Sequence, residues 1–146
     1  MCRDIIDRLA KAKRPVVFAG GGIRASGQHE LFLKLIAKLG VPVVGGWNAY
    51  DILWNDHPLY AGRPGTIGDR PGNFTVQNAD LLLILGSRLN IRQVSYNWKS
   101  FARQAFKIWV EVDEPEMRKP SVKADLPVHA DLKEFFPAMV QAGMDR

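Results

Sequence analysis

The sequence is poor in features that place many proteins outside the cytoplasm. Its 146 residues include one cysteine, Cys2, so no disulfide can form within the chain, which is typical of a reducing compartment. No run of about 18 apolar residues is present, and a membrane-spanning helix needs a run of that length. Charged residues near the start, among them Asp4 and Asp7, break the apolar core that a signal peptide requires. We therefore expect a cytoplasmic protein with no membrane partner.

The sequence also lacks the motifs that mark common catalytic centres. The three histidines, His29, His57 and His129, lie far apart, and no Cys/His set has the spacing of a metal site. There is no G-x-S-x-G nucleophile elbow and no G-x-x-x-x-G-K-[ST] phosphate loop. These absences predict a domain that holds a ligand or supports other domains and contributes no catalytic residue and no metal ligand of its own.

Basic charge is present but dispersed. The chain has 20 Lys and Arg against 15 Asp and Glu, a net charge of +5, without a run of five basic residues. Nucleic-acid-binding proteins cluster their basic residues on one face, so we expect no nucleic-acid partner. The arginines nearest to glycine-rich segments favour one small anion instead; they are Arg63, Arg70, Arg88 and Arg92.

Short apolar runs alternate with segments of helical period. The runs predict five strands, at 16–19, 41–44, 81–85, 106–112 and 126–129. Helices are predicted at 4–13, 29–39, 73–78, 97–105 and from 132 to about 141, with Ser26 and Asp131 as caps. Strands separated by helices pair in parallel. The predicted fold is a single α/β domain over residues 1–146, a three-layer α/β/α Rossmann-like domain with a parallel sheet of five or six strands.

Residues 45–72 break this pattern. The segment holds six glycines and three prolines, together with Trp47 and Trp54, and has no clear period. Long irregular segments in compact domains are often functional, so this one is a candidate surface for docking a partner.

In a parallel sheet, ligands collect where loops leave the carboxyl ends of the strands. The first such loop begins with Gly20, Gly21 and Gly22. Glycine lets the backbone approach a ligand closely, and the N–H groups at the start of the following helix can bind a phosphate. A plain tight turn explains the same three glycines equally well.

Two further loops carry charged residues. Gly86, Ser87 and Arg88 follow the third predicted strand, with Arg92 four residues later, and arginine binds phosphate or carboxylate through a planar fork. The two arginines could instead remain in solvent or pair with acidic residues after the fourth strand. There, Glu111 could bind ribose hydroxyls, whereas we expect Asp113 to cap a helix that opens at residue 114.

Six segments, in this order, resemble one protein family. They are RPVVFAGGGI (14–23), VPVVGGW (41–47), HPLYAGRPGTIGDRPGN (57–73), ADLLLILGSRLNIRQ (79–93), VEVDEPEM (110–117) and LPVHADL (126–132). Together they cover nearly the whole chain and resemble the central domain of thiamine diphosphate-dependent enzymes. The resemblance is nearest to the acetolactate synthase group, also called acetohydroxyacid synthase large subunits.

The resemblance implies a six-stranded Rossmann-like sheet and a longer enzyme of three domains. In that family the first domain supplies the glutamate that activates the thiazolium ring, and the third binds thiamine diphosphate and its magnesium. The third domain's mark, G-D-G with a later asparagine pair, is absent here, where only Gly68-Asp69-Arg70 occurs. The chain therefore resembles the middle domain, whose partners are the other two domains. The whole enzyme is expected to be a homodimer or homotetramer that acts on a 2-keto acid such as pyruvate.

The resemblance also implies roles for individual residues toward FAD or ADP; relatives can also hold a coenzyme A nucleotide or nothing. Gly20, Gly21 and Gly22 would face the ribityl-diphosphate part of FAD. The glycine–small–arginine stretch corresponds to Gly86, Ser87 and Arg88, with Arg92 as its trailing arginine; Glu111 and Val112 would lie near the adenosine, and Asp131 in the adenine-side turn. Two other functions remain open: a free-standing NAD- or FAD-binding domain of the sirtuin-like fold group, and a partner-docking domain.

Overall fold

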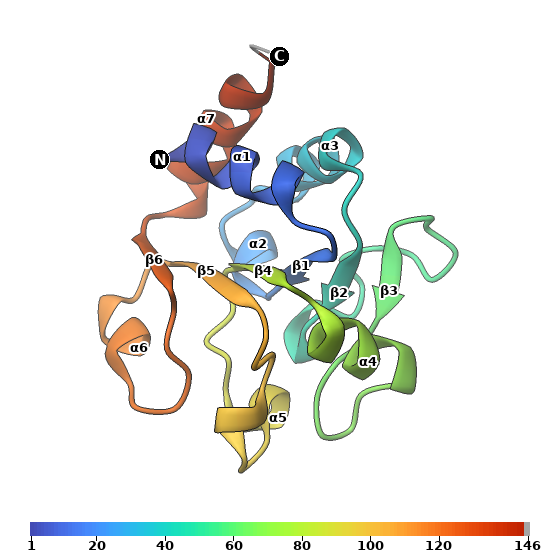
Figure 1. The fold of residues 1–146 in the computed structure, drawn as a ribbon. Coiled ribbons are helices and arrows are strands. Elements are labelled where there is room, and N and C mark those ends of the chain that lie inside the picture. The colour runs from blue at the N-terminus through green and yellow to red at the C-terminus, as the bar shows by residue number, and fades with distance from the viewer. Residues whose placement is uncertain (145–146) are drawn as a thin grey trace.

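The computed structural model describes residues 1–144, which form a parallel sheet of six strands (Figure 1). The strands are β1 Pro15–Ala19, β2 Val43–Gly45, β3 Tyr60–Gly62, β4 Leu81–Leu85, β5 Phe106–Glu111 and β6 Leu126–His129. Their order in the sheet is β3-β2-β1-β4-β5-β6, and every neighbouring pair is parallel. This order is that of the doubly wound nucleotide-binding folds, which confirms the predicted Rossmann-like architecture.

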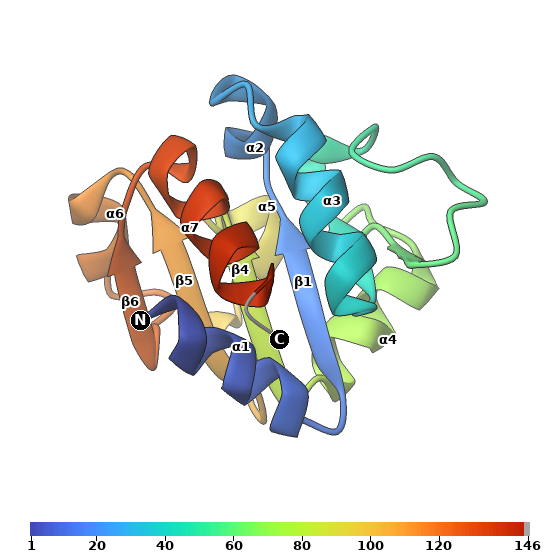
Figure 2. The same ribbon diagram turned by 90° about the horizontal axis from the view of Figure 1, so that it is seen from above.

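Helices cover both faces of the sheet (Figures 1 and 2). The face nearer the chain ends carries α1 Cys2–Lys11, α3 His29–Leu39 and α7 Leu132–Met144, and the opposite face carries α4 Arg70–Asn78, α5 Ile91–Val94 and α6 Glu114–Arg118. Short turns fill the loops, namely α2 Gly22–Ala25, η1 Trp47–Ala49 and η2 Trp98–Ser100. Within residues 1–144, no helix has both the length and the apolar character that crossing a bilayer demands.

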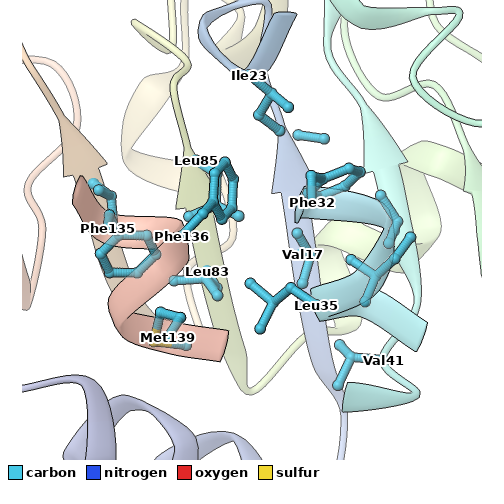
Figure 3. Packing of buried hydrophobic residues seen from close by; sticks show 14 of the residues in the cluster. Val17, Ile23, Phe32, Leu35, Val41, Leu83, Leu85, Phe135, Phe136 and Met139 are labelled. Atoms are coloured by element: carbon cyan, nitrogen blue, oxygen red, sulfur yellow. The ribbon is translucent and has the colours of Figure 1, made fainter. Parts of the chain in front are cut away.

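The central strands are buried because helices pack on both of their faces. All five residues of β4 are buried, as their unbroken run of leucine and isoleucine predicts. Successive strand residues point to opposite faces, so Val17 and Leu83 pack toward α3 and α7, whereas Phe18 and Ile84 pack toward α4. Figure 3 shows the first of these layers, in which the Phe32 ring of α3 lies 6.1 Å from that of Phe136 in α7.

Strand β3 is the element that the sequence pattern does not reveal. It has three residues, Tyr60–Gly62, of which two are half-buried, so it shows no apolar run. It pairs with β2 beyond the irregular segment and completes the six-stranded sheet that the family resemblance implies.

Residues 97–105 do not form the helix that was predicted for them. Only η2 is helical there, and Ala102 has a φ of +43°. The N–H of Ala102 donates to Oε1 of Gln77 in α4 at 2.7 Å, and the Phe101 ring enters the core 6.4 Å from Phe18. The prediction was wrong because contacts with other elements outweigh the local helical tendency.

The predicted caps have mixed outcomes. Asp131 does begin α7, because its Oδ1 accepts a hydrogen bond from the N–H of Lys133 at 2.9 Å. Ser26 does not cap α3, which starts after Gln28, and its hydroxyl donates to the carbonyl of Ile23. Helix α4 starts three residues before the predicted position because Asp69 accepts a hydrogen bond from the N–H of Gly72 at 2.7 Å.

Candidate functional site

The main cavity lies where the strand order reverses. Strand β1 is followed along the chain by β2 on one side of it, and its other neighbour is β4, so the loops after β1 and β4 diverge at the carboxyl edge of the sheet. A cavity of about 620 Å³ opens there, bordered by the loops after β1, β2, β4 and β5 and by the turn before α7. Its position is the one at which doubly wound sheets bind ligands.

Two glycine loops form the base of this cavity by packing against each other. The N–H of Gly20 donates to the carbonyl of Leu85 at 2.9 Å, and that of Gly22 donates to the carbonyl of Gly86 at 2.9 Å. A Cβ on Gly22 would lie 2.8 Å from Cα of Gly86, and Gly86 itself has a φ of +59°. Close approach of the two loops therefore accounts for Gly20, Gly22 and Gly86 without a ligand. Between them, Gly21 is half-buried and lines the cavity.

Arg88 stands at the rim of the cavity within a group of charges. One guanidinium nitrogen lies 3.0 Å from a carboxylate oxygen of Asp113, and another lies 4.0 Å from Glu116. Nζ of Lys119 donates to Oε2 of Glu116 at 2.8 Å and also to the carbonyl of Arg88. Two cations and two carboxylates thus form one group, of which Arg88 and Asp113 line the cavity. The exposed Arg88 can exchange its acidic partner for an anionic ligand.

The expected capping role of Asp113 is not observed. Asp113 occupies the N-cap position of α6, but its side chain makes no capping hydrogen bond and pairs with Arg88 instead. The pairing of an arginine with an acidic residue after β5, left open by the sequence, is therefore the arrangement that forms.

Glu111 provides a buried carboxylate at the end of β5. Its side chain borders the cavity, and the residue is 6% exposed. Oε1 accepts hydrogen bonds from the N–H groups of Val112 at 2.9 Å and Asp113 at 3.1 Å, which hold the carboxylate in place. A fixed carboxylate accepts hydrogen bonds from hydroxyl groups and repels phosphate, so this end of the cavity suits a sugar.

Two further predicted residues contribute through the backbone and through packing. Ser87 is buried; its carbonyl accepts a hydrogen bond from Nε1 of Trp109 at 2.8 Å, and its hydroxyl accepts one from the N–H of Leu89 at 3.2 Å. Asp131 lines the cavity while capping α7.

The structure gathers nine of the ten predicted site residues around the cavity. They are Gly20, Gly21, Gly22, Gly86, Ser87, Arg88, Glu111, Val112 and Asp131. Arg92 is the exception: its guanidinium stacks over the Trp47 ring at 5.3 Å and does not line the cavity, although Trp47 does.

Sequence reasoning missed Gln93, the next residue after Arg92. Gln93 is 6% exposed and lines the cavity, yet neither Nε2 nor Oε1 has a hydrogen-bond partner within residues 1–144. Glutamine is mostly an exposed residue, so nothing in the sequence marks this one as buried. An unpartnered buried polar group costs about 1–3 kcal/mol, which makes Gln93 unusual.

The charged residues at the cavity do not form a metal site. Among residues 1–144, no group of three or more His, Cys, Asp or Glu side chains is close enough to hold an ion. The arrangement suits binding of a nucleotide, with sugar at Glu111 and phosphate at Gly21 and Arg88.

Comparison with known proteins identifies relatives of the whole chain. The family model "Thiamine pyrophosphate enzyme, central domain" matches residues 2–139. A "probable acetolactate synthase large subunit" of Methanococcus aeolicus is 36% identical over 95% of this chain and 23% of its own length. The acetolactate synthase large subunit of Lactococcus lactis is 33% identical over 95% of this chain and 24% of its own. The acetolactate synthase isozyme 2 large subunit of Escherichia coli is 31% identical over 91% of this chain and 24% of its own length. The chain thus spans about a quarter of the length of these relatives.

Proposed function

Because the chain belongs to the family of thiamine pyrophosphate enzyme central domains, we propose that it is the middle domain of an acetolactate synthase-like enzyme. The match over nearly the whole chain and only about a quarter of each relative supports a longer protein with a domain on either side. In this proposal those domains bind thiamine diphosphate and magnesium, and the present chain is the central domain that the family model describes.

The proposed enzyme is a cytoplasmic homo-oligomer. It decarboxylates a 2-keto acid such as pyruvate and transfers the remaining acyl group to an acceptor. Thiamine diphosphate, when bound, supplies the stabilised carbanion that this chemistry needs. The present chain contributes a rigid frame between the catalytic domains and a bound adenine nucleotide, FAD or ADP.

The observation that carries the nucleotide proposal is the buried carboxylate of Glu111 in a cavity at the point where the strand order reverses. Glu111 accepts hydrogen bonds from the hydroxyl groups of the ribose at the β5 end. The diphosphate lies over Gly21 toward Arg88, whose planar guanidinium fits phosphate oxygens. A nucleotide in this orientation keeps its negative charge away from Glu111 and beside Arg88, which lines the cavity.

Calorimetry with ADP, FAD and NAD tests the ligand. We expect ADP or FAD to bind at micromolar to low millimolar concentration, and binding to weaken with salt because phosphate contacts are screened. The same titration with Arg92→Ala controls for loss of a cation near but outside the cavity. If no adenine nucleotide binds at millimolar concentration, the cavity holds no nucleotide and this part of the proposal fails.

The parent activity is tested separately. The coding sequence around the chain is extended in both directions, the full product is expressed, and acetolactate formation from pyruvate is measured with thiamine diphosphate and magnesium. A G-D-G segment downstream and pyruvate-dependent turnover would support the proposal. Flanking sequence without that segment would refute it.

A further inference from the structure

One of the smaller pockets lies next to the main cavity and shares Gln93 with it. It has a volume of about 260 Å³ and lies between the loop after β3, helix α4 and residues 93–101. We call it the Gln93 pocket, because Gln93 borders both this pocket and the main cavity. Every side chain that lines it is uncharged; the hydroxyl-bearing ones are Thr66, Ser95 and Ser100.

The side-chain amide of Gln93 lies between the main cavity and the Gln93 pocket. A Cβ on Gly46, beside the main cavity, would lie 3.3 Å from Oε1, and a Cβ on Gly65, beside the pocket, would lie 3.3 Å from Nε2. Rotating the amide by 180° exchanges the two atoms but leaves both between the same two glycines. Glycine at both positions leaves no side chain between the amide and these two loops, and the amide has no hydrogen-bond partner within residues 1–144.

Backbone strain is found at the same pocket. Ser95 has a φ of +63° and a ψ of −179°, a conformation that is adopted almost only by glycine. The N–H of Ser95 donates to the carbonyl of Ile91 at 2.8 Å, which holds the strained residue at the end of α5. The strained residue thus lies two positions after Gln93 and on the lining of the pocket.

We propose that the Gln93 pocket binds an uncharged group that carries an N–H donor beside a carbonyl acceptor, such as a primary carboxamide or a lactam. Such a group offers both a donor and an acceptor, so the Gln93 amide atom that lies near Gly65 gains a hydrogen bond whichever of its two orientations the amide adopts. The uncharged lining disfavours phosphates, carboxylates and ammonium groups, since their charge would be buried without a partner. This site shares Gln93 with the main cavity, but the proposal does not depend on nucleotide binding there.

Nuclear magnetic resonance of the 15N-labelled 146-residue chain tests the proposal, with acetamide and 2-pyrrolidone as probes. We expect saturable shifts of the Gln93 side-chain NH₂ signals with both probes and none with acetate, the charged analogue of acetamide. Gln93→Leu should weaken binding at least tenfold, whereas Gln141→Leu, at an exposed glutamine of α7, should leave it unchanged. Titration with ADP on the same samples reports separately on the main cavity.

The stability of the Gln93→Leu variant separates a binding role from a purely structural one. Leucine is similar in size to glutamine and lacks the two unpartnered amide atoms. The melting temperature of the Gln93→Leu variant should therefore equal or exceed that of the parent chain. The proposal is overturned if neither probe gives a saturable shift, if acetate shifts the Gln93 signals as strongly, or if solvent-exchange signals show only an ordered water at the amide. The titration of the unmodified chain decides between these outcomes even if the leucine variant does not fold.

Discussion

Gly20 and Gly86 lie backbone against backbone where β1 and β4 end. A Cβ built on Gly20 would overlap the carbonyl oxygen of Gly86, so no other residue fits there without moving one of the loops. This contact sets the spacing of the two loops that border the candidate site.

Gly20→Ala is therefore expected to destabilise the domain by about 2–3 kcal/mol, because the added methyl forces the two loops apart. Gly143→Ala provides the control. A Cβ there would meet Cδ1 of Ile6 at an ordinary 3.9 Å, and alanine in α7 should stabilise the domain by about 0.5 kcal/mol. Equilibrium unfolding in urea measures both changes. Equal stability of the two variants would contradict the close packing.

The pairing of Arg88 with Asp113 predicts opposite effects of two substitutions on nucleotide binding. Arg88→Ala should lower the affinity for ADP about tenfold or more, because a charge-assisted contact to phosphate is lost. Asp113→Asn should raise that affinity severalfold, because it releases Arg88 and removes a nearby negative charge. Both variants should change stability by less than about 1 kcal/mol, since the ion pair is exposed. Calorimetry would count against the assignment if both substitutions shifted affinity in the same direction.

The proposed sugar contact at Glu111 can be tested with a modified ligand. Glu111→Gln should weaken ADP binding about tenfold, because an amide oxygen accepts hydrogen bonds from ribose hydroxyls less strongly than a carboxylate. For 2′,3′-dideoxy-ADP, the substitution should have little effect, since the hydroxyls are missing. A loss of equal size for both ligands would show that Glu111 acts only on the protein's own backbone.

Asp80 predicts a pH-dependent contribution to stability. Burial raises the pKa of its carboxyl. Hydrogen bonds from the N–H groups of Arg14 and Lys13, at 2.9 and 2.8 Å, and the positive charge of Arg14 lower the pKa by more than burial raises it. The pKa of Asp80 is therefore below its ordinary value. A group with a lowered folded-state pKa stabilises the fold above its unfolded pKa of about 3.9, and this stabilisation is lost as the pH falls through the folded value.

Asp80→Asn should accordingly destabilise the domain by about 1–2 kcal/mol at pH 7, because an amide has one acceptor oxygen for two N–H groups. The difference from the parent chain should be smaller at a strongly acidic pH, because Asp80 loses its charge as the pH falls through its lowered folded-state pKa. Urea unfolding at the two pH values measures it, with Asp56→Asn, at an exposed loop position, as control. A difference that persists at low pH would exclude the carboxylate charge as its cause.

The parts of the fold that the sequence predicts are those built from apolar periodicity. The run Leu81–Leu85 is buried throughout, and Leu35 and Ile36 of His29–Leu39 are buried as predicted, together with Phe32. Strand β3 and residues 97–105 escape such prediction, since their conformation depends on pairing with β2 and on the bond from Ala102 to Gln77. Those contacts join residues that are far apart in the chain.

The same distinction holds at the candidate site. Glycine and arginine after apolar runs mark the loops at the carboxyl edge, and most of these residues do border the cavity. Sequence could not show that Arg92 turns onto Trp47 while Gln93 turns inward, because the direction of each side chain in the short helix α5 is set by its packing.

Hydrogen bonds from polar side chains fix the backbone at the end of the irregular segment 45–72. Asp69 accepts hydrogen bonds from the N–H groups of Arg63 and Gly72, and Asn73 bonds both the N–H and the carbonyl of Gly65. A surface that is ordered before it meets a partner has little conformational entropy left to lose. Packing of a neighbouring domain on this part of the segment would therefore cost less conformational entropy than packing on a flexible loop.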